Sequence, residues 1–139
     1  KAITLAPLNS DYLYSRGLLK NQLKDYASAI LDFTTSIYLN RDYNLVKPPV
    51  HHVDPRHAKP LVGRGMALLQ TGRPHNALGD GNLALKLLER QFDAPEWDYY
   101  QPTIHLQLSD VHELLGDSYS ALGRPEEARN EYEQASRYR

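Results

Sequence analysis

The chain has 139 residues, 41% of them hydrophobic, and a formal net charge of −1 at pH 7. This charge gives no general attraction to nucleic acids or anionic membranes, and no apolar run reaches the ~18 residues of a membrane-spanning helix. The absence of cysteine excludes disulfide bonds and thiolate metal sites but fits a reducing or an oxidising compartment equally well. We therefore expect no nucleic-acid binding and no membrane insertion, and the compartment stays open.

The first predicted element is a pair of helices near the N-terminus. Residues 9–11 are good N-cap types, and apolar side chains recur at helical spacing from there to Leu23. After a break at residues 24–25, a second set with the same spacing continues to Ile37. This pattern predicts helices at 11–23 and 26–39.

Two later pairs of helices are marked by the same turn signal. The segments Gly72-Arg73-Pro74 and Gly123-Arg124-Pro125 each place a glycine two residues before a proline. Glycine supplies the left-handed residue that ends a helix, and proline suits the first turn of the next one. Helices are therefore predicted at 59–71, 74–91, 102–122 and 125–138.

The three pairs share one pattern of small residues. Gly17, Gly65 and Gly116 lie 48 and 51 residues apart, and an alanine follows each of them 12 residues later: Ala29, Ala77 and Ala128. Small side chains at these positions let two helix axes approach to about 8–10 Å. Such self-similarity is typical of an array of two-helix units, which works by presenting a surface.

Charged residues recur in the same register. An arginine directly before the glycine is followed 16 residues later by an aspartate in two copies, as Arg16 with Asp32 and Arg64 with Asp80. An arginine on an inner helix face and a carboxylate from the second helix would satisfy each other. The third copy has Leu115 in place of the arginine, opposite Glu131. We expect these pairs to be structural rather than catalytic.

Catalytic motifs are missing from the sequence. There is no glycine-rich phosphate loop, no nucleophile elbow and no dinucleotide fingerprint. His112-Glu113 begins like a zinc protease helix, but Gly116 stands where the second histidine is required. We therefore expect neither enzyme activity nor a cofactor.

One segment has the residue types of a metal site. His51, His52, Asp54 and His57 lie within seven residues, and three imidazoles with a carboxylate could converge on a zinc or nickel ion. Adjacent histidines tend to point apart, however, and Asp54-Pro55 is explained equally well as an N-cap and the first helical residue. We favour the N-cap, so no native metal site is expected.

The helical pairs resemble the repeats of the tetratricopeptide family. The resemblance is carried by Arg16-Gly17, Asp25-Tyr26, Ala29-Ile30 and Asp32-Phe33 in the first pair, and by Leu115-Gly116, Ala128 and Tyr132 in the third. It implies an all-α solenoid of about three helix-turn-helix repeats with extended joints. The middle repeat has Gly81 where the family has an aromatic residue, so a thinner contact or a local bend is expected there.

This resemblance also sets the expected domain organisation. Residues 1–139 would form a single repeat domain, with repeats at about 10–40, 58–91 and 102–139. Residues 1–9 look like the end of a preceding repeat, so we expect a longer array.

The resemblance further implies a concave peptide-binding groove lined by the first helix of each repeat. Its residues would be Tyr14, Leu18, Asn21, Lys59, Val62, Met66, Leu69, Asp110, Glu113 and Asp117. This surface grades from aromatic and aliphatic to acidic, so the expected partner is a protein or peptide segment with apolar residues at one end and lysine or arginine at the other. The positions with which some family members clamp a C-terminal carboxylate hold Tyr14, Leu18, Gly63, Asp110 and Leu114, so such a clamp is not expected.

Two other surfaces offer alternatives to the groove. The joint at 91–101 contains Trp97, Tyr99 and Tyr100, which form either a self-packed hairpin tip or a binding ridge. The last predicted helix leaves the apolar edge of Tyr132 and Ala135 without a neighbour, which favours stacking of the open ends onto further repeats or copies of the chain. The two functional hypotheses are therefore a peptide-binding adaptor and an assembly or scaffolding module.

Overall fold

The computed structural model describes residues 9–40, 58–92 and 101–139, and these residues form helices and turns without any strand. The helices are α2 (Ser10–Gln22), α3 (Tyr26–Leu39), α5 (Lys59–Gln70), α6 (Pro74–Phe92), α7 (Gln101–Ala121) and α8 (Pro125–Arg137). Each begins and ends within one residue of its predicted bounds. The predicted all-α repeat fold is confirmed.

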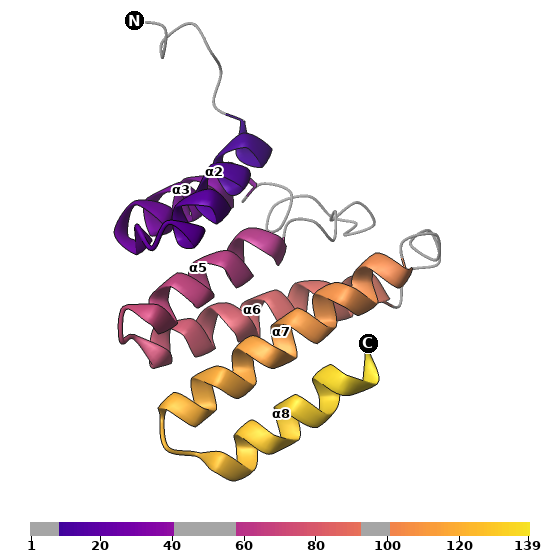
Figure 1. The fold of residues 1–139 in the computed structure, drawn as a ribbon. Coiled ribbons are helices and arrows are strands. Elements are labelled where there is room, and N and C mark those ends of the chain that lie inside the picture. Colours follow the sequence, from indigo (N-terminus) through magenta and orange to yellow (C-terminus); the bar gives the residue numbers. More distant parts are fainter. Residues whose placement is uncertain (1–8, 41–57, 93–100) are drawn as a thin grey trace, which may run out of the picture.

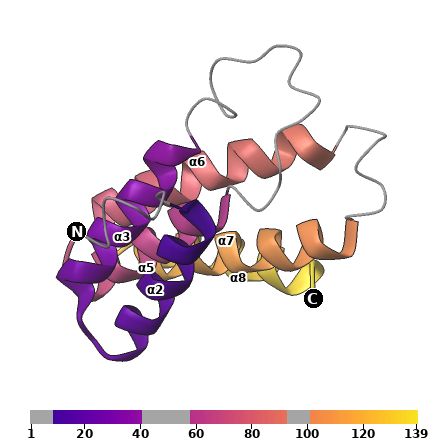
Figure 2. The ribbon, with the colours of Figure 1, turned by 90° about the horizontal axis from the view of Figure 1, so that it is seen from above.

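The helices form three antiparallel hairpins that stack in chain order (Figure 1). Helix α2 pairs with α3, α5 with α6 and α7 with α8, and each hairpin packs on the next. Helix α5 also contacts both α2 and α7, so the first helices of the three hairpins lie side by side. Figure 2 shows the stack from above, where α6 and α7 extend together beyond the first hairpin.

The three hairpins turn in the same way. Gly72 and Gly123 have φ angles of +78° and +75°, and Lys24 takes the same position in the first hairpin with a φ of +62°. The next residue closes each turn by donating its backbone N–H to the carbonyl five residues earlier, with an N–O distance of 2.9 Å in all three turns. This is the hydrogen bond that closes a helix end of the Schellman type. In the first hairpin, Lys24 therefore adopts the left-handed backbone conformation that glycine adopts in the other two turns.

Aromatic side chains fill the space beside glycines in the first and third hairpins. The ring of Phe33 lies so close to two neighbouring helices that a Cβ atom would be 2.7 Å from it at Gly17 and 2.6 Å at Gly63. In the third hairpin, a Cβ at Gly116 would lie 2.6 Å from the ring of Tyr132. Real Cβ atoms do not approach this closely, so glycine is required for these rings to pack as they do.

In the middle hairpin, leucine side chains lie beside the glycines in place of an aromatic ring. A Cβ at Gly81 would lie 2.7 Å from Leu115 Cδ2, and one at Gly65 would lie 2.6 Å from Leu114 Cδ2. Both leucines belong to α7 of the next hairpin. The expectation of a thinner contact at Gly81 is therefore wrong, because leucines of α7 occupy the space that the missing aromatic ring leaves.

A cluster of buried apolar side chains joins the second and third hairpins. Its members come from α5, α6 and α7 and from the residue before α5: Ala58, Leu61, Ala84, Leu87, Leu88, Ile104, Leu108, Val111 and Leu115. The alanines at the repeat positions, Ala29, Ala77 and Ala128, are buried as well. No helix in the described ranges combines the length and the hydropathy that a bilayer-spanning segment requires.

Bidentate ion pairs join the two helices of the first and second hairpins. Nε and Nη2 of Arg16 each donate to an oxygen of Asp32 at 2.8 Å, and Arg64 binds Asp80 in the same way at 2.8 Å. Nζ of Lys20 also lies 3.0 Å from Asp32. Hydrogen bonds from Arg16, and then from Lys20, lower the pKa of Asp32 against the opposing effect of burial. Among the described residues, Asp32 thus has two cationic partners and Asp80 has one.

Candidate functional site

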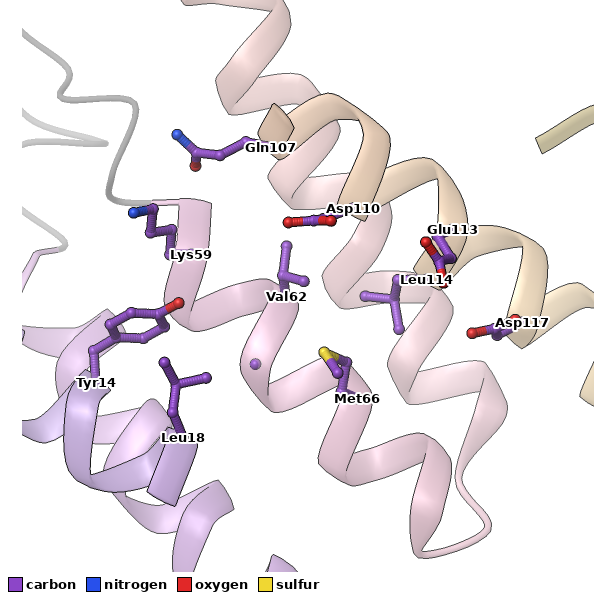
Figure 3. A pocket seen from close by; sticks show the side chains of 11 residues that line it. Tyr14, Leu18, Lys59, Val62, Met66, Gln107, Asp110, Glu113, Leu114 and Asp117 are labelled. Carbon is purple, nitrogen blue, oxygen red and sulfur yellow. The ribbon is translucent and has the colours of Figure 1, made fainter. Parts of the chain in front are cut away.

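A cavity of about 400 Å³ opens along the side where the first helices of the three hairpins meet. Its walls are formed by Tyr14 and Leu18 of α2, by Lys59, Val62, Gly63 and Met66 of α5, and by Gln107, Asp110, Glu113, Leu114 and Asp117 of α7. Figure 3 shows these side chains converging on one space from three separate helices. We call this space the groove. Its volume lies in the range of about 300–1,000 Å³ that is usual for ligand sites.

The side of the groove formed by α2 and α5 is largely apolar. Tyr14 packs against Phe33 with their ring centroids 6.0 Å apart, so the buried aromatic residue of the first hairpin supports this wall from behind. Leu18 is exposed beside it, and Met66 is 51% exposed at the middle of the groove. Exposed apolar side chains in a concave surface favour binding of another apolar group.

The α7 side of the groove carries three carboxylates that differ in their ion-pair and hydrogen-bond partners. Glu113 forms an ion pair with Arg139, and Asp117 accepts a 2.6 Å hydrogen bond from the hydroxyl of Tyr132. That hydrogen bond is the main reason why the pKa of Tyr132 is raised to about 12. Asp110, by contrast, accepts no hydrogen bond within the described part of the chain.

The electrostatics of the groove favour a positive group beside Asp110. Desolvation, and after it the charge of Glu113, raises the pKa of Asp110, whereas Arg139 and Lys59 act in the opposite direction. Desolvation, with a smaller contribution from Asp110, also raises the pKa of Tyr14 on the facing wall. A cation here would lower the pKa values of both Asp110 and Tyr14, because it stabilises the ionised form of a nearby acid.

Gln107 lies at the end of the groove next to Lys59. It is only 6% exposed, yet in the described ranges neither the nitrogen nor the oxygen of its carboxamide has a hydrogen-bond partner. Figure 3 shows this carboxamide extending from α7 towards Lys59. An unpaired buried polar atom costs about 1–3 kcal/mol, so groups of this kind are rare in folded proteins.

A second hollow of about 250 Å³ continues the groove towards the turns of the hairpins. It shares Met66, Leu114 and Asp117 with the groove and adds Asn21, Tyr26, Leu69 and Gln70. Asn21 donates a 3.3 Å hydrogen bond from Nδ2 to the carbonyl of Gly63, which joins α2 to α5, while its Oδ1 has no hydrogen-bond partner in the part of the chain that the structure describes. Met66 therefore lines both spaces.

The family model of the tetratricopeptide repeat matches residues 10–43 and 109–139, which include the first hairpin and most of the third. These two segments are tetratricopeptide repeats. Tetratricopeptide repeats are protein–protein interaction modules, so the family implies a protein partner. Neither a curated protein nor a solved structure matches the chain.

The structure brings together the residues that the tetratricopeptide resemblance proposed for the groove. Eight of the ten line the groove, and the other two, Asn21 and Leu69, line the adjoining hollow. The expectation missed Gln107, which lies two residues before the second matched segment. A signal for it exists in the sequence, because Gln107 interrupts the buried face formed by Ile104, Leu108 and Val111.

The third tetratricopeptide hairpin contains a polar pair that the sequence analysis also missed. Glu131, expected opposite Leu115, has its Oε1 2.7 Å from Nδ1 of His112. The His112 ring stacks on Tyr138 with an interplanar angle of 2° and a centroid distance of 5.8 Å. This arrangement joins α7 to the end of α8 where the other hairpins use an arginine–aspartate pair.

Two candidate sites lie outside the described residues. These are the histidine segment with His51, His52, Asp54 and His57, and the aromatic segment with Trp97, Tyr99 and Tyr100. Within the described ranges, no group of three or more histidine, aspartate or glutamate side chains is arranged to hold a metal ion.

Proposed function

We propose that this tetratricopeptide-repeat chain binds a segment of another protein in the groove and acts as an adaptor without catalysing a reaction. The observation that carries the proposal is the groove itself, in which an apolar wall from α2 and α5 faces an acidic wall from α7. All three hairpins contribute to this surface, so it exists only in the assembled array. A fixed concave surface of this kind suits an extended or helical peptide segment.

The composition of the walls supports a ligand that is partly apolar and partly basic. Tyr14, Leu18 and Met66 offer apolar contact area, and methionine adapts its shape to different partners. On the facing side, Asp110, Glu113 and Asp117 outnumber Lys59, which is the one basic residue among the described residues that line the cavity. Charges of opposite sign on the partner would therefore improve both the association rate and the specificity.

A pull-down with a matched pair of variants tests the proposal. Met66→Lys places a charge on the apolar part of the groove, and Leu83→Lys places one on α6 at a similarly exposed side chain, 48% against 51%. We expect proteins captured by the parent chain to be lost with Met66→Lys and retained with Leu83→Lys, with both variants folded by circular dichroism. Capture of the same proteins by Met66→Lys would contradict the proposal.

Assembly is a second candidate because of an exposed apolar surface on the first hairpin. Tyr12 and Leu19 of α2, Leu23 directly after it and Leu31 of α3 are all exposed and lie outside the groove. A contact through this surface would join the array to further repeats or to a second copy of the chain. Light scattering of the parent chain and of a Leu23→Glu variant over a range of concentrations tests this. A mass that rises with concentration only in the parent supports assembly, and a constant monomer mass excludes self-association.

A further inference from the structure

We infer that the groove recognises a lysine or arginine of its partner at two points, with Gln107 pairing to a backbone amide beside that residue and Asp110 binding its charged group. This inference rests on the proposed function, because it specifies which segment the groove binds.

The first point of recognition follows from the unpaired carboxamide of Gln107. Its nitrogen donates and its oxygen accepts, and a peptide amide offers the complementary acceptor and donor. An extended chain can therefore satisfy both atoms of Gln107 together, whereas an apolar ligand would leave both unpaired. Gln107 also lies outside the part of α7 that matches the family model.

The second point is the carboxylate of Asp110. Glu113 is paired with Arg139, and Asp117 with the hydroxyl of Tyr132, so these two acids already have partners. Asp110 faces the cavity without a hydrogen-bond donor from the described residues. A lysine ammonium or an arginine guanidinium would supply one, and hydrogen bonds between charged groups are stronger than neutral ones.

The spacing of the two residues decides how one ligand can reach both. Gln107 and Asp110 are three residues apart on α7, which places their Cβ atoms about 5–6 Å apart on one helix face. An extended chain advances about 3.3 Å per residue. The amide at Gln107 and the side chain at Asp110 therefore come from the same residue of the ligand or from adjacent ones.

Lys59 gives the bound segment a direction. Its side chain lies at the Gln107 end of the groove, as Figure 3 shows. A positive ligand group is repelled there, while a backbone carbonyl is attracted. The basic side chain is therefore directed along α7 towards Asp110.

A peptide array with the whole chain tests the inference. The probes are acetylated and amidated hexapeptides with apolar flanks and a central lysine, arginine, norleucine or glutamate. We expect the lysine and arginine peptides to retain about tenfold more protein than the norleucine peptides, the factor expected for one charged hydrogen bond. Asp110→Asn should remove this preference, and Asp25→Asn, an exposed aspartate at the first turn, should keep it.

The backbone contact is tested by methylating each peptide nitrogen in turn. Methylation at one nitrogen next to the basic residue should lower the affinity of the peptide for the parent chain about tenfold. The same methylation should not lower its affinity for Gln107→Leu any further. Gln22→Leu, at an exposed glutamine of α2, is the matched control and should behave as the parent does. A methylation pattern that is the same for the parent and Gln107→Leu would overturn the role of Gln107.

Thermal melting separates this role from a structural one. Because Gln107 has no hydrogen-bond partner among the described residues, Gln107→Leu should leave the Tm unchanged or raise it while binding weakens. A clear fall in Tm would show that the carboxamide serves the fold instead, and would contradict the inference.

The Met66→Lys variant distinguishes failure of this inference from failure of the proposed function. If the parent retains peptides regardless of the central residue and Met66→Lys retains none, the groove binds peptides but the inference is wrong. If Met66→Lys retains the same peptides as the parent, or if the parent retains no peptide at all, both the inference and the proposed function are wrong.

Discussion

The first and middle hairpins share one sequence pattern but differ in which hairpin supplies the large side chain at the junction with the next hairpin. In the first, Phe33 of the second helix packs against Gly17 of its own hairpin and Gly63 of the next. In the middle one, Gly81 stands in the place of that ring and receives Leu115 from the following hairpin. The comparison shows that the bulky residue needed at a repeat junction can come from either side of it. A weak match to a repeat pattern therefore need not mean weak packing.

The largest effect is expected where the aromatic ring is fully buried. Phe33 is 0% exposed, and Phe33→Ala should lower the free energy of unfolding by about 3–5 kcal/mol, because it leaves a cavity between three helices. Tyr132, its counterpart in the third hairpin, is 38% exposed, so Tyr132→Ala should cost less. Urea unfolding followed by circular dichroism measures both. Equal losses would show that burial of the ring does not set its contribution.

Two glycines of α6 should respond to alanine in opposite directions. At Gly79 an added Cβ would have no atom of the described residues within 4 Å, so Gly79→Ala should stabilise the protein by about 0.5–1 kcal/mol through helix propensity. Gly81→Ala meets Leu115 inside the core, and overpacking of this kind costs about 1–3 kcal/mol. Unfolding midpoints of the two variants test the difference. If Gly81→Ala is as stable as Gly79→Ala, the middle junction is not tightly filled.

The two ion pairs allow a finer comparison of the same hairpins. Arg16→Met leaves Asp32 with Lys20, whereas Arg64→Met leaves Asp80 without a cationic partner among the described residues. We expect Arg64→Met to cost more by about 1 kcal/mol, the usual contribution of one hydrogen bond to a buried group. The double variant Arg16→Met with Lys20→Met should remove the difference. Chemical denaturation at low ionic strength is the appropriate measurement.

The smallest expected effect is a pH dependence from the first pair. The pKa of Asp32 is lowered in the folded state, so its contribution is fully present above the ordinary value of about 3.9 and is lost as the pH falls through the lowered pKa. Asp32→Asn should therefore reduce the loss of Tm between neutral pH and the acidic range below about 3.9. Asp25→Asn serves as an exposed control. An unchanged slope for Asp32→Asn would show that the pair does not contribute to acid stability.

The sequence predicted what depends on local periodicity and left out what depends on contacts between hairpins. Helix ends in the second and third hairpins followed from the glycine and proline signals, and the Arg16–Asp32 pair followed from a spacing that repeats. Gln107 was missed because nothing in a single helix shows that a buried amide lacks a partner. The contact of Gly81 with Leu115 was missed because those residues belong to different repeats, and their distance is set by how the hairpins stack.

The filling of the middle hairpin from α7 has a consequence for how such an array can change over evolutionary time. A duplication that copied residues 58–92 alone would copy the space beside Gly81 without the leucine that fills it. The unit that could be duplicated with its packing intact is therefore the second and third hairpins together. Lengthening this array by single-repeat insertion next to the middle hairpin would need a new large side chain at the junction in the same step.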